Sequence, residues 1–281
     1  MPIQPIPSGL VSRMEPLKGI KAVAFDVYGT LLISDTGQML HKTDGLHVTA
    51  EEDRKSIVLE AAVSAGIKLP AASAGRLASD LDSEIRRLQL TAKAAGIVHP
   101  ESDIRDVWTS VLRETEVSVT FGQIERLAVE YEIRVNRTWP MPGALGCLQD
   151  LYGSTELGII SNAQFLTPLI LDQQLGSSFS DLIPRDQCFW SYEHGHAKPG
   201  KVLFEIASDC FEKMGIDRCS CLFVGNDMRN DIWAAATCGW RTALFAGDAR
   251  TLKLRKDDER CRSLRPDLTI NTLAQLPPLI Q

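Results

Sequence analysis

The stretch that most constrains the fold runs from Ile20 to Leu32 and reads Ile-Lys-Ala-Val-Ala-Phe-Asp-Val-Tyr-Gly-Thr-Leu-Leu. Its first residues are mostly apolar and β-prone, and they end on the carboxylate of Asp26, before Gly29 and Thr30 turn the chain. A short apolar run bounded by turn residues is typical of a buried strand in a parallel sheet. Asp26 then lies at the carboxyl end of a strand, where open α/β sheets bind ligands. The simpler alternative is that Asp26 only caps the following turn.

The composition favours a soluble, cytoplasmic protein. The chain has 281 residues, 44% of them hydrophobic, and a net charge of -6, which argues against nucleic acid or an anionic membrane as a partner. The seven cysteines are odd in number and form no C-x-x-C pair, as expected of reduced thiols. Neither a secretory signal nor a membrane-spanning apolar run is found, and the sequence is compatible with a monomer or a homodimer.

The segment 35–136 has helical periodicity throughout and predicts a small bundle. The expected helices are Thr49–Gly66 with a capping box from Thr49 to Glu52, Ala71–Ala95, a third opened by Pro100, and Thr120–Arg134. Trp108 and Tyr131 fall on the apolar faces and are expected in the core of the bundle. Arg86 and Arg87 are expected on a solvated face, although a cap arginine that binds an anionic substrate is an alternative.

From Pro142 onward, strand patterns alternate with helix patterns, which predicts a doubly wound, mostly parallel, Rossmann-like sheet. The first strand belongs to this sheet but precedes the helical segment, so the bundle is an insertion after the first strand. We therefore expect an α/β domain from 16–34 and 137–281, a helical domain from 35–136 and a flexible arm from 1–15.

Polar side chains follow four of the predicted strands: Asp26, Ser161, Lys198 and the pair Asp227 and Asp231. The carboxyl ends of parallel strands meet at one edge of a sheet, so these groups are expected to lie together. A carboxylate nucleophile, a hydroxyl, an ammonium group and two further acids suit phosphoryl transfer assisted by Mg²⁺, which prefers oxygen ligands.

The chain resembles the haloacid dehalogenase superfamily in four ordered motifs. They are Asp26-Val-Tyr-Gly-Thr30, Ser161-Asn162, Lys198-Pro199 and Gly225-Asn-Asp227-x-x-x-Asp231. The resemblance covers the sheet domain, and the helical insertion matches the position of that superfamily's helical cap. It implies a hydrolase that acts on a small anionic molecule.

The resemblance also implies a role for each acid of the site. Asp26 would be the nucleophile, and Mg²⁺ would be bound by Asp26, Asp227 and the main-chain carbonyl of Tyr28. Asp231 would orient Lys198 or a metal-bound water.

The remaining motif residues would contact the substrate or support the site. Ser161 and nearby backbone N–H groups would bind the transferred phosphoryl group, and Asn162 and Lys198 would contribute to the same pocket. Tyr28 would lie against the substrate, and Thr30 would support the substrate-binding loop by hydrogen bonding.

Tyr28 departs from the phosphatases of the superfamily, which usually carry there a second Asp as general acid and base. The 2-haloacid dehalogenases share the Asp-x-Tyr-Gly-Thr pattern, and a tyrosine with a pKa near 10 is a poor base at neutral pH. Other proton donors would be histidines, namely His41, His47, His194 and His196, although each is expected at the surface.

Three functions follow from these motifs. The acid pair Asp227 and Asp231 favours a Mg²⁺-dependent phosphatase of a small phosphorylated metabolite that works through an aspartyl-phosphate. Tyr28 favours a cofactor-independent 2-haloacid dehalogenase. A third possibility is a non-catalytic or very slow binding protein on the same fold.

Overall fold

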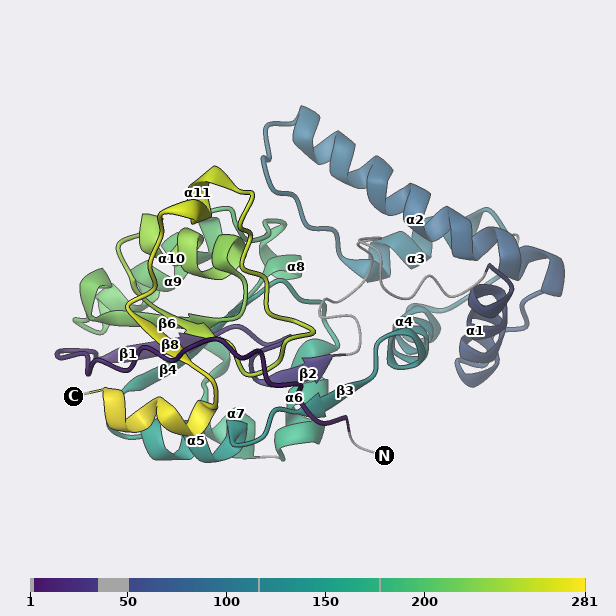
Figure 1. The fold of residues 1–281 in the computed structure, drawn as a ribbon. Coiled ribbons are helices and arrows are strands. Elements are labelled where there is room, and N and C mark those ends of the chain that lie inside the picture. The colour runs from purple at the N-terminus through teal and green to yellow at the C-terminus, as the bar shows by residue number, and fades with distance from the viewer. Residues whose placement is uncertain (1–2, 35–50, 116, 177, 281) are drawn as a thin grey trace.

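The computed structural model describes residues 3–34, 51–115, 117–176 and 178–280 (Figure 1). Its main sheet has the strand order β5-β4-β1-β6-β7-β8, and every neighbouring pair is parallel. The strands are β1 (Ala22–Phe25), β4 (Glu156–Ser161), β5 (Cys188–Trp190), β6 (Cys221–Gly225), β7 (Arg241–Phe245) and β8 (Leu268–Ile270). The predicted α/β class is therefore confirmed.

The helices of the α/β part form a layer on each side of this sheet (Figure 1). One layer contains α5 (Ala144–Leu151), α6 (Thr167–Leu175) and α7 (Ser178–Leu182), and the other contains α8 (Ser191–His194), α9 (Val202–Lys213), α10 (Ala234–Thr237) and α11 (Glu259–Arg262). The α/β part also contains short helical turns, which are η1 (Arg185–Gln187), η2 (Arg218–Ser220), η3 (Met228–Trp233), η4 (Leu273–Gln275) and η5 (Pro277–Leu279). Val23 and Phe25 of β1 pack on the first layer and Ala22 and Ala24 on the second, as period-two alternation requires.

The central strand β1 is the point at which the order of the sheet reverses. The chain continues from β4 to β5 on one side of β1 and from β6 to β8 on the other. Such a reversal leaves a crevice beyond the carboxyl ends of the strands, which is the usual ligand site of open α/β sheets.

The short strands β2 (Leu32–Ser34) and β3 (Thr138–Pro140) pair antiparallel, and the described residues between them form four helices. They are α1 (Glu51–Ser64), α2 (Ala71–Ala94), α3 (Ile104–Arg113) and α4 (Phe121–Val135). This bundle has its own core, in which the predicted core residues Trp108 and Tyr131 are buried with ring centroids 5.4 Å apart. The predicted cap at Thr49 lies outside the described residues.

Two helix starts differ from the sequence expectation. The third helix begins at Ile104 rather than Pro100, because Asp103 caps it by accepting the backbone N–H of Arg105 at 2.8 Å. The sequence pattern also predicts a helix from Asn230 to Cys238. This helix begins earlier, as a wide π turn at Met228, where the side chain of Asp227 accepts two backbone N–H groups.

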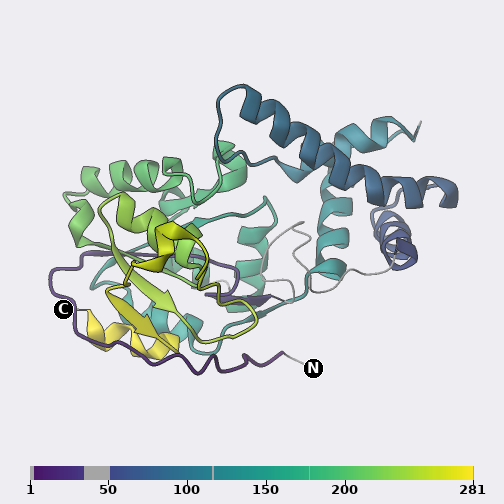
Figure 2. The same cartoon turned by 45° about the horizontal axis from the view of Figure 1, so that its top comes forward.

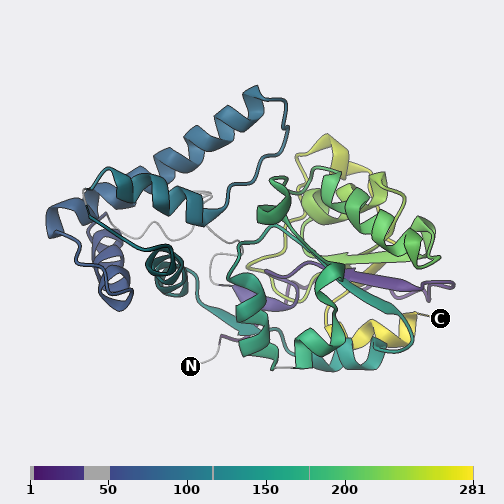
Figure 3. The same ribbon diagram turned by 180° about the vertical axis from the view of Figure 1, so that it is seen from behind.

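The segment 95–103, which joins α2 to α3 within the bundle, approaches α8 of the sheet domain (Figure 3). In this segment the carbonyl of His99 accepts from the backbone N–H of Ala197 at 2.7 Å, and the backbone N–H of Glu101 donates to the carbonyl of Gly195 at 3.1 Å. The insertion is therefore joined by backbone hydrogen bonds to the loop that leads into Lys198.

The N-terminal segment runs along the edge of the sheet domain (Figure 2). Arg13 and Thr269 of β8 exchange two backbone hydrogen bonds of 2.9 Å, and the Ser8 hydroxyl donates to the carbonyl of Ala246 at 2.6 Å. Unpaired groups at the edge of β8 thus bind this segment at Arg13, and the flexible arm expected for residues 1–15 stays a prediction.

Candidate active site

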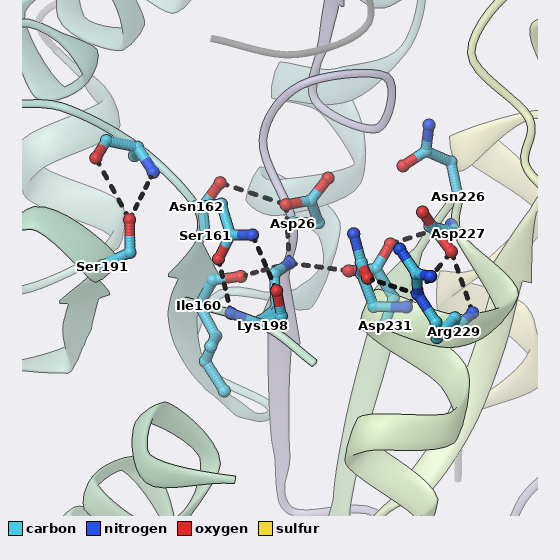
Figure 4. A network of polar contacts seen from close by, with 12 residues as sticks. Asp26, Ile160, Ser161, Asn162, Ser191, Lys198, Asn226, Asp227, Arg229 and Asp231 are labelled. Atoms are coloured by element: carbon cyan, nitrogen blue, oxygen red, sulfur yellow. Dashed lines mark hydrogen bonds and ion pairs between the residues drawn. The ribbon is translucent and has the colours of Figure 1, made fainter. Parts of the chain in front are cut away.

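The first three motifs meet at the carboxyl ends of β1, β4 and β5 (Figure 4). Lys198 Nζ lies 2.8 Å from Asp26 Oδ1 and also donates to the carbonyl of Ile160 at 3.0 Å. The Ser161 hydroxyl donates to the same Asp26 oxygen at 3.0 Å. Asp26 Oδ1 is thus held by two donors, whereas Oδ2 accepts no hydrogen bond within the described part of the chain.

The fourth motif completes the network. Asp231 Oδ1 lies 2.7 Å from Lys198 Nζ, and Asp231 Oδ2 accepts the backbone N–H of Asp227 at 2.9 Å. Gly225 makes this possible, because a Cβ at that position would lie 2.5 Å from the Asp231 carboxylate. Lys198 therefore connects the carboxylate that follows β1 to a carboxylate that follows the neighbouring strand β6.

Burial governs the protonation of this cluster. Burial opposes the charge of Lys198, but Asp231 and Asp26 outweigh it and raise the pKa of the amine, which stays charged. Burial is also the main reason that the pKa of Asp231 rises to about 7; Lys198 opposes this rise, and the charges of Asp26 and Asp227 add to it. One ammonium group shared by two buried acids neutralises only one of them.

We expect the stability of the protein to depend on the protonation of Asp231. Its pKa is raised in the folded state, so the folded state binds this proton more tightly than the unfolded chain does. This contribution to the free energy of unfolding is present below about pH 4 and is lost as the pH rises through about 7. Urea titrations with chelator present measure this contribution as the difference between the unfolding free energies of wild type and Asp231→Asn. This difference should fall as the pH rises over this range. Asp150→Asn, an exposed control, should show no such trend; a flat difference for Asp231→Asn would contradict the assignment.

A cavity of about 350 Å³ opens between this cluster and the helical insertion. Asp26, Lys198 and Asp227 line it from the sheet domain, and Lys93 and His99 line it from the insertion. Its volume is in the range of small-molecule sites. Cations from both parts of the chain surround it, including Lys93, Arg229 and Lys253.

Tyr28 lines this cavity but cannot act as a base. It is 4% exposed, and its hydroxyl lies 3.0 Å from the Thr167 hydroxyl. Burial raises the pKa of Tyr28 well above 10, and Glu132 and Asp26 raise it further, whereas the bond to Thr167 opposes them. The phenol is therefore neutral at every pH at which the protein is expected to work.

The structure shows the surroundings of three motif residues that were expected to bind the substrate or to support its loop. The Ser161 side chain is fully buried and holds Asp26 instead of facing the cavity. The Asn162 amide lines the cavity but binds the backbone of Lys198, donating at 3.1 Å and accepting at 2.7 Å. Thr30 is fully buried and does not line the cavity, and within the described residues its hydroxyl has no hydrogen-bond partner. The loop is held by backbone hydrogen bonds and by the close packing of Gly29 instead of by the Thr30 side chain.

Of the four histidines considered as proton donors, the structure describes two. His194 and His196 do not line the cavity, and His41 and His47 lie outside the described residues. His99, which the sequence did not single out, does line it. Arg86 and Arg87 are exposed on α2, as expected of a solvated face.

The structure adds one strong contact that the sequence did not predict. Arg255, in the loop after β7, places Nη2 2.7 Å from Asp227 Oδ2 and Nε 3.2 Å from Asp227 Oδ1. No motif marks this arginine, and its distance of 28 residues from Asp227 gives no signal in the sequence.

The sequence profile of the haloacid dehalogenase-like hydrolases matches residues 20–239. The chain belongs to this family. A curated relative, the pyrimidine 5'-nucleotidase YjjG of Escherichia coli (strain K12), is 29% identical over 143 residues, which are 50% of this chain and 56% of the relative. This chain thus spans about half the length of that relative.

Solved structures of the family share the fold. The 2-haloacid dehalogenase from Pseudomonas syringae pv. Tomato DC3000 is 20% identical, with a TM-score of 0.55 over 92% of this chain and 97% of that one. A HAD phosphatase from Thermococcus onnurineus is 17% identical, with a TM-score of 0.50 over 92% and 97%. Both chemistries of the haloacid dehalogenase-like family therefore occur on this architecture. No helix among the described residues is long and apolar enough to cross a membrane.

Proposed function

We propose that this chain is a Mg²⁺-dependent phosphomonoester hydrolase that acts on a small phosphorylated metabolite. The observation that carries the proposal is that the two carboxylate oxygens of Asp26 have different surroundings. One oxygen is fixed by Lys198 and Ser161, and the other is left for attack on a substrate in the cavity. The nucleotidase named above, which acts on pyrimidine nucleotides, supports the choice of phosphate esters.

Oxygen donors of the kind that Mg²⁺ prefers meet at the sheet edge. Asp26, Tyr28 and Asp227 all line the cavity. The described residues contain no cluster of three or more His, Cys, Asp or Glu that could hold a metal. A magnesium ion that keeps several waters would need only Asp26, Asp227 and the Tyr28 carbonyl from the protein. Bound there, Mg²⁺ would neutralise charge on the phosphoryl oxygens.

The residues of the chain would perform two half-reactions. Asp26 Oδ2 attacks phosphorus, the bond from phosphorus to the ester oxygen breaks, and the leaving oxygen takes a proton from solvent water. Lys198 lies beside the nucleophile and offers positive charge to the oxygens of the phosphoryl group. Water then hydrolyses the aspartyl-phosphate and releases phosphate, which regenerates Asp26.

A panel of substrates tests the proposal. The raised pKa of Tyr28 makes its phenol a weak general acid as well as a poor base, and general acid–base assistance is worth about 10²–10⁴-fold. We therefore expect aryl phosphates, which need little assistance, to turn over faster than alkyl phosphates and nucleoside 5'-monophosphates, and chelator to abolish all turnover. Rapid hydrolysis of alkyl esters would show that another acid acts, and His99→Gln would then test the histidine that lines the cavity.

A second candidate function is 2-haloacid dehalogenation without a metal. The contact between Arg255 and Asp227 favours it, because the guanidinium already neutralises this carboxylate. Asp26 would then displace halide from carbon. Release of halide from a 2-haloacid in the presence of chelator would establish this function in place of the phosphatase, and inertness toward the whole panel would indicate a binding protein.

A further inference from the structure

Arg255 occupies the carboxylate that the proposed metal needs. Besides its 2.7 Å contact to Asp227 Oδ2, its Nε lies within 3.3 Å of both carboxylate oxygens. Asp227 Oδ1 also accepts the backbone N–H groups of Arg229 and Asn230 at 2.9 and 3.1 Å. Both oxygens of Asp227 are therefore engaged, and the side chains of the pair are only 7% and 25% exposed.

The loop that carries Arg255 is tied to the fourth motif. The Asn226 amide donates to the carbonyl of Thr251 at 2.7 Å, and Lys253 exchanges backbone hydrogen bonds with this motif. Arg255 has a backbone φ angle of 49°, in the left-handed region that non-glycine residues rarely adopt. This turn aims the guanidinium at Asp227, so the contact is built into the course of the loop.

The contact with Arg255 changes the charge at Asp227 as well as the access to its carboxylate oxygens. The guanidinium of Arg255 places its positive charge directly against the carboxylate of Asp227. A bound Mg²⁺ requires a carboxylate oxygen at about 2.1 Å in a nearly octahedral shell. A forked guanidinium on the same carboxylate blocks this approach and repels the ion.

The surface next to the pair offers another place for the guanidinium. A surface cavity is lined by Arg255, Asp257 and Glu259. Within the described part of the chain, neither of these acids forms an ion pair. Arg255 can therefore leave Asp227 without losing every anionic partner.

We propose that Arg255 competes with the divalent cation for Asp227, so that metal binds only when the guanidinium moves away. The inference rests on the proposed metal dependence. It makes Arg255 a positioning residue that sets metal affinity, and it couples metal binding to movement of the loop that contains residues 251–258.

Calorimetric titration with MgCl₂ tests this competition directly. Arg255→Gln should bind Mg²⁺ at least about tenfold more tightly than wild type, because the competitor is gone. Arg255→Lys, which retains charge but not the fork, should fall between them. Arg262→Gln removes an exposed arginine elsewhere in the C-terminal region and should bind like wild type. Adding Asp227→Asn to Arg255→Gln should abolish the tight binding, which assigns the ion to this carboxylate.

Equal or weaker Mg²⁺ affinity in Arg255→Gln would overturn the competition but leave the proposed phosphatase standing. Absence of binding in wild type and in both Arg255 variants would overturn the competition together with the metal dependence. Circular dichroism checks that each variant folds. If Arg255→Gln does not fold, Arg255→Lys decides, because competition requires it to bind more tightly than wild type.

Discussion

Replacing Asp26 by asparagine is expected to lower kcat/KM for aryl phosphates by about 10⁴-fold or more, because the nucleophile is lost. The fold should persist, since an amide oxygen can still accept from Lys198 and Ser161, which both bind Asp26 Oδ1 in the structure. Steady-state kinetics and circular dichroism measure the two effects separately.

A covalent intermediate distinguishes Asp26 as the nucleophile from Asp26 as a metal ligand only. Rapid quenching of wild type during turnover should yield a peptide that contains Asp26 and carries one added phosphoryl group, and Asp26→Asn should not. Asp150→Asn, at an exposed position away from the site, should behave like wild type in both measurements. Turnover of Asp26→Asn within tenfold of wild type would exclude the mechanism.

Replacing Lys198 by methionine is expected to affect both activity and stability. The side chain of Lys198 is 2% exposed and forms ion pairs with Asp26 and Asp231. Removing it leaves buried carboxylates without a counter-charge, which costs about 3–5 kcal/mol for a buried pair. Activity should fall by about 10²–10³-fold or more, because charge stabilisation of the reacting phosphoryl group is lost.

Urea denaturation and kinetics test this prediction together. Lys201→Met, an exposed change in the same loop, should alter neither stability nor rate. Adding Asp231→Asn to Lys198→Met should recover part of the lost stability, since one of the unpaired carboxylates is then neutral. A Lys198→Met protein as stable as wild type would show that the buried triad contributes little to folding.

The sequence by itself determined the sheet and the place of the site. The apolar run before Asp26 predicts β1, and similar runs predict β4 and β6 to within a residue or two. Strand ends of a parallel sheet converge, so the contact of Lys198 with Asp26 and Asp231 follows once the strands are known. Such features depend on local patterns, which a sequence displays directly.

Other features were decided only by the tertiary structure. The contact of Arg255 with Asp227 and the position of His99 in the cavity lining depend on how two loops fold back over the sheet edge. The direction of the Ser161 hydroxyl depends on its burial beside Asp26. These contacts join residues far apart in the chain through irregular backbone, where no periodicity constrains the side chain. Long-range packing and hydrogen bonding, rather than local propensity, therefore set the charge around the motif that the sequence had located.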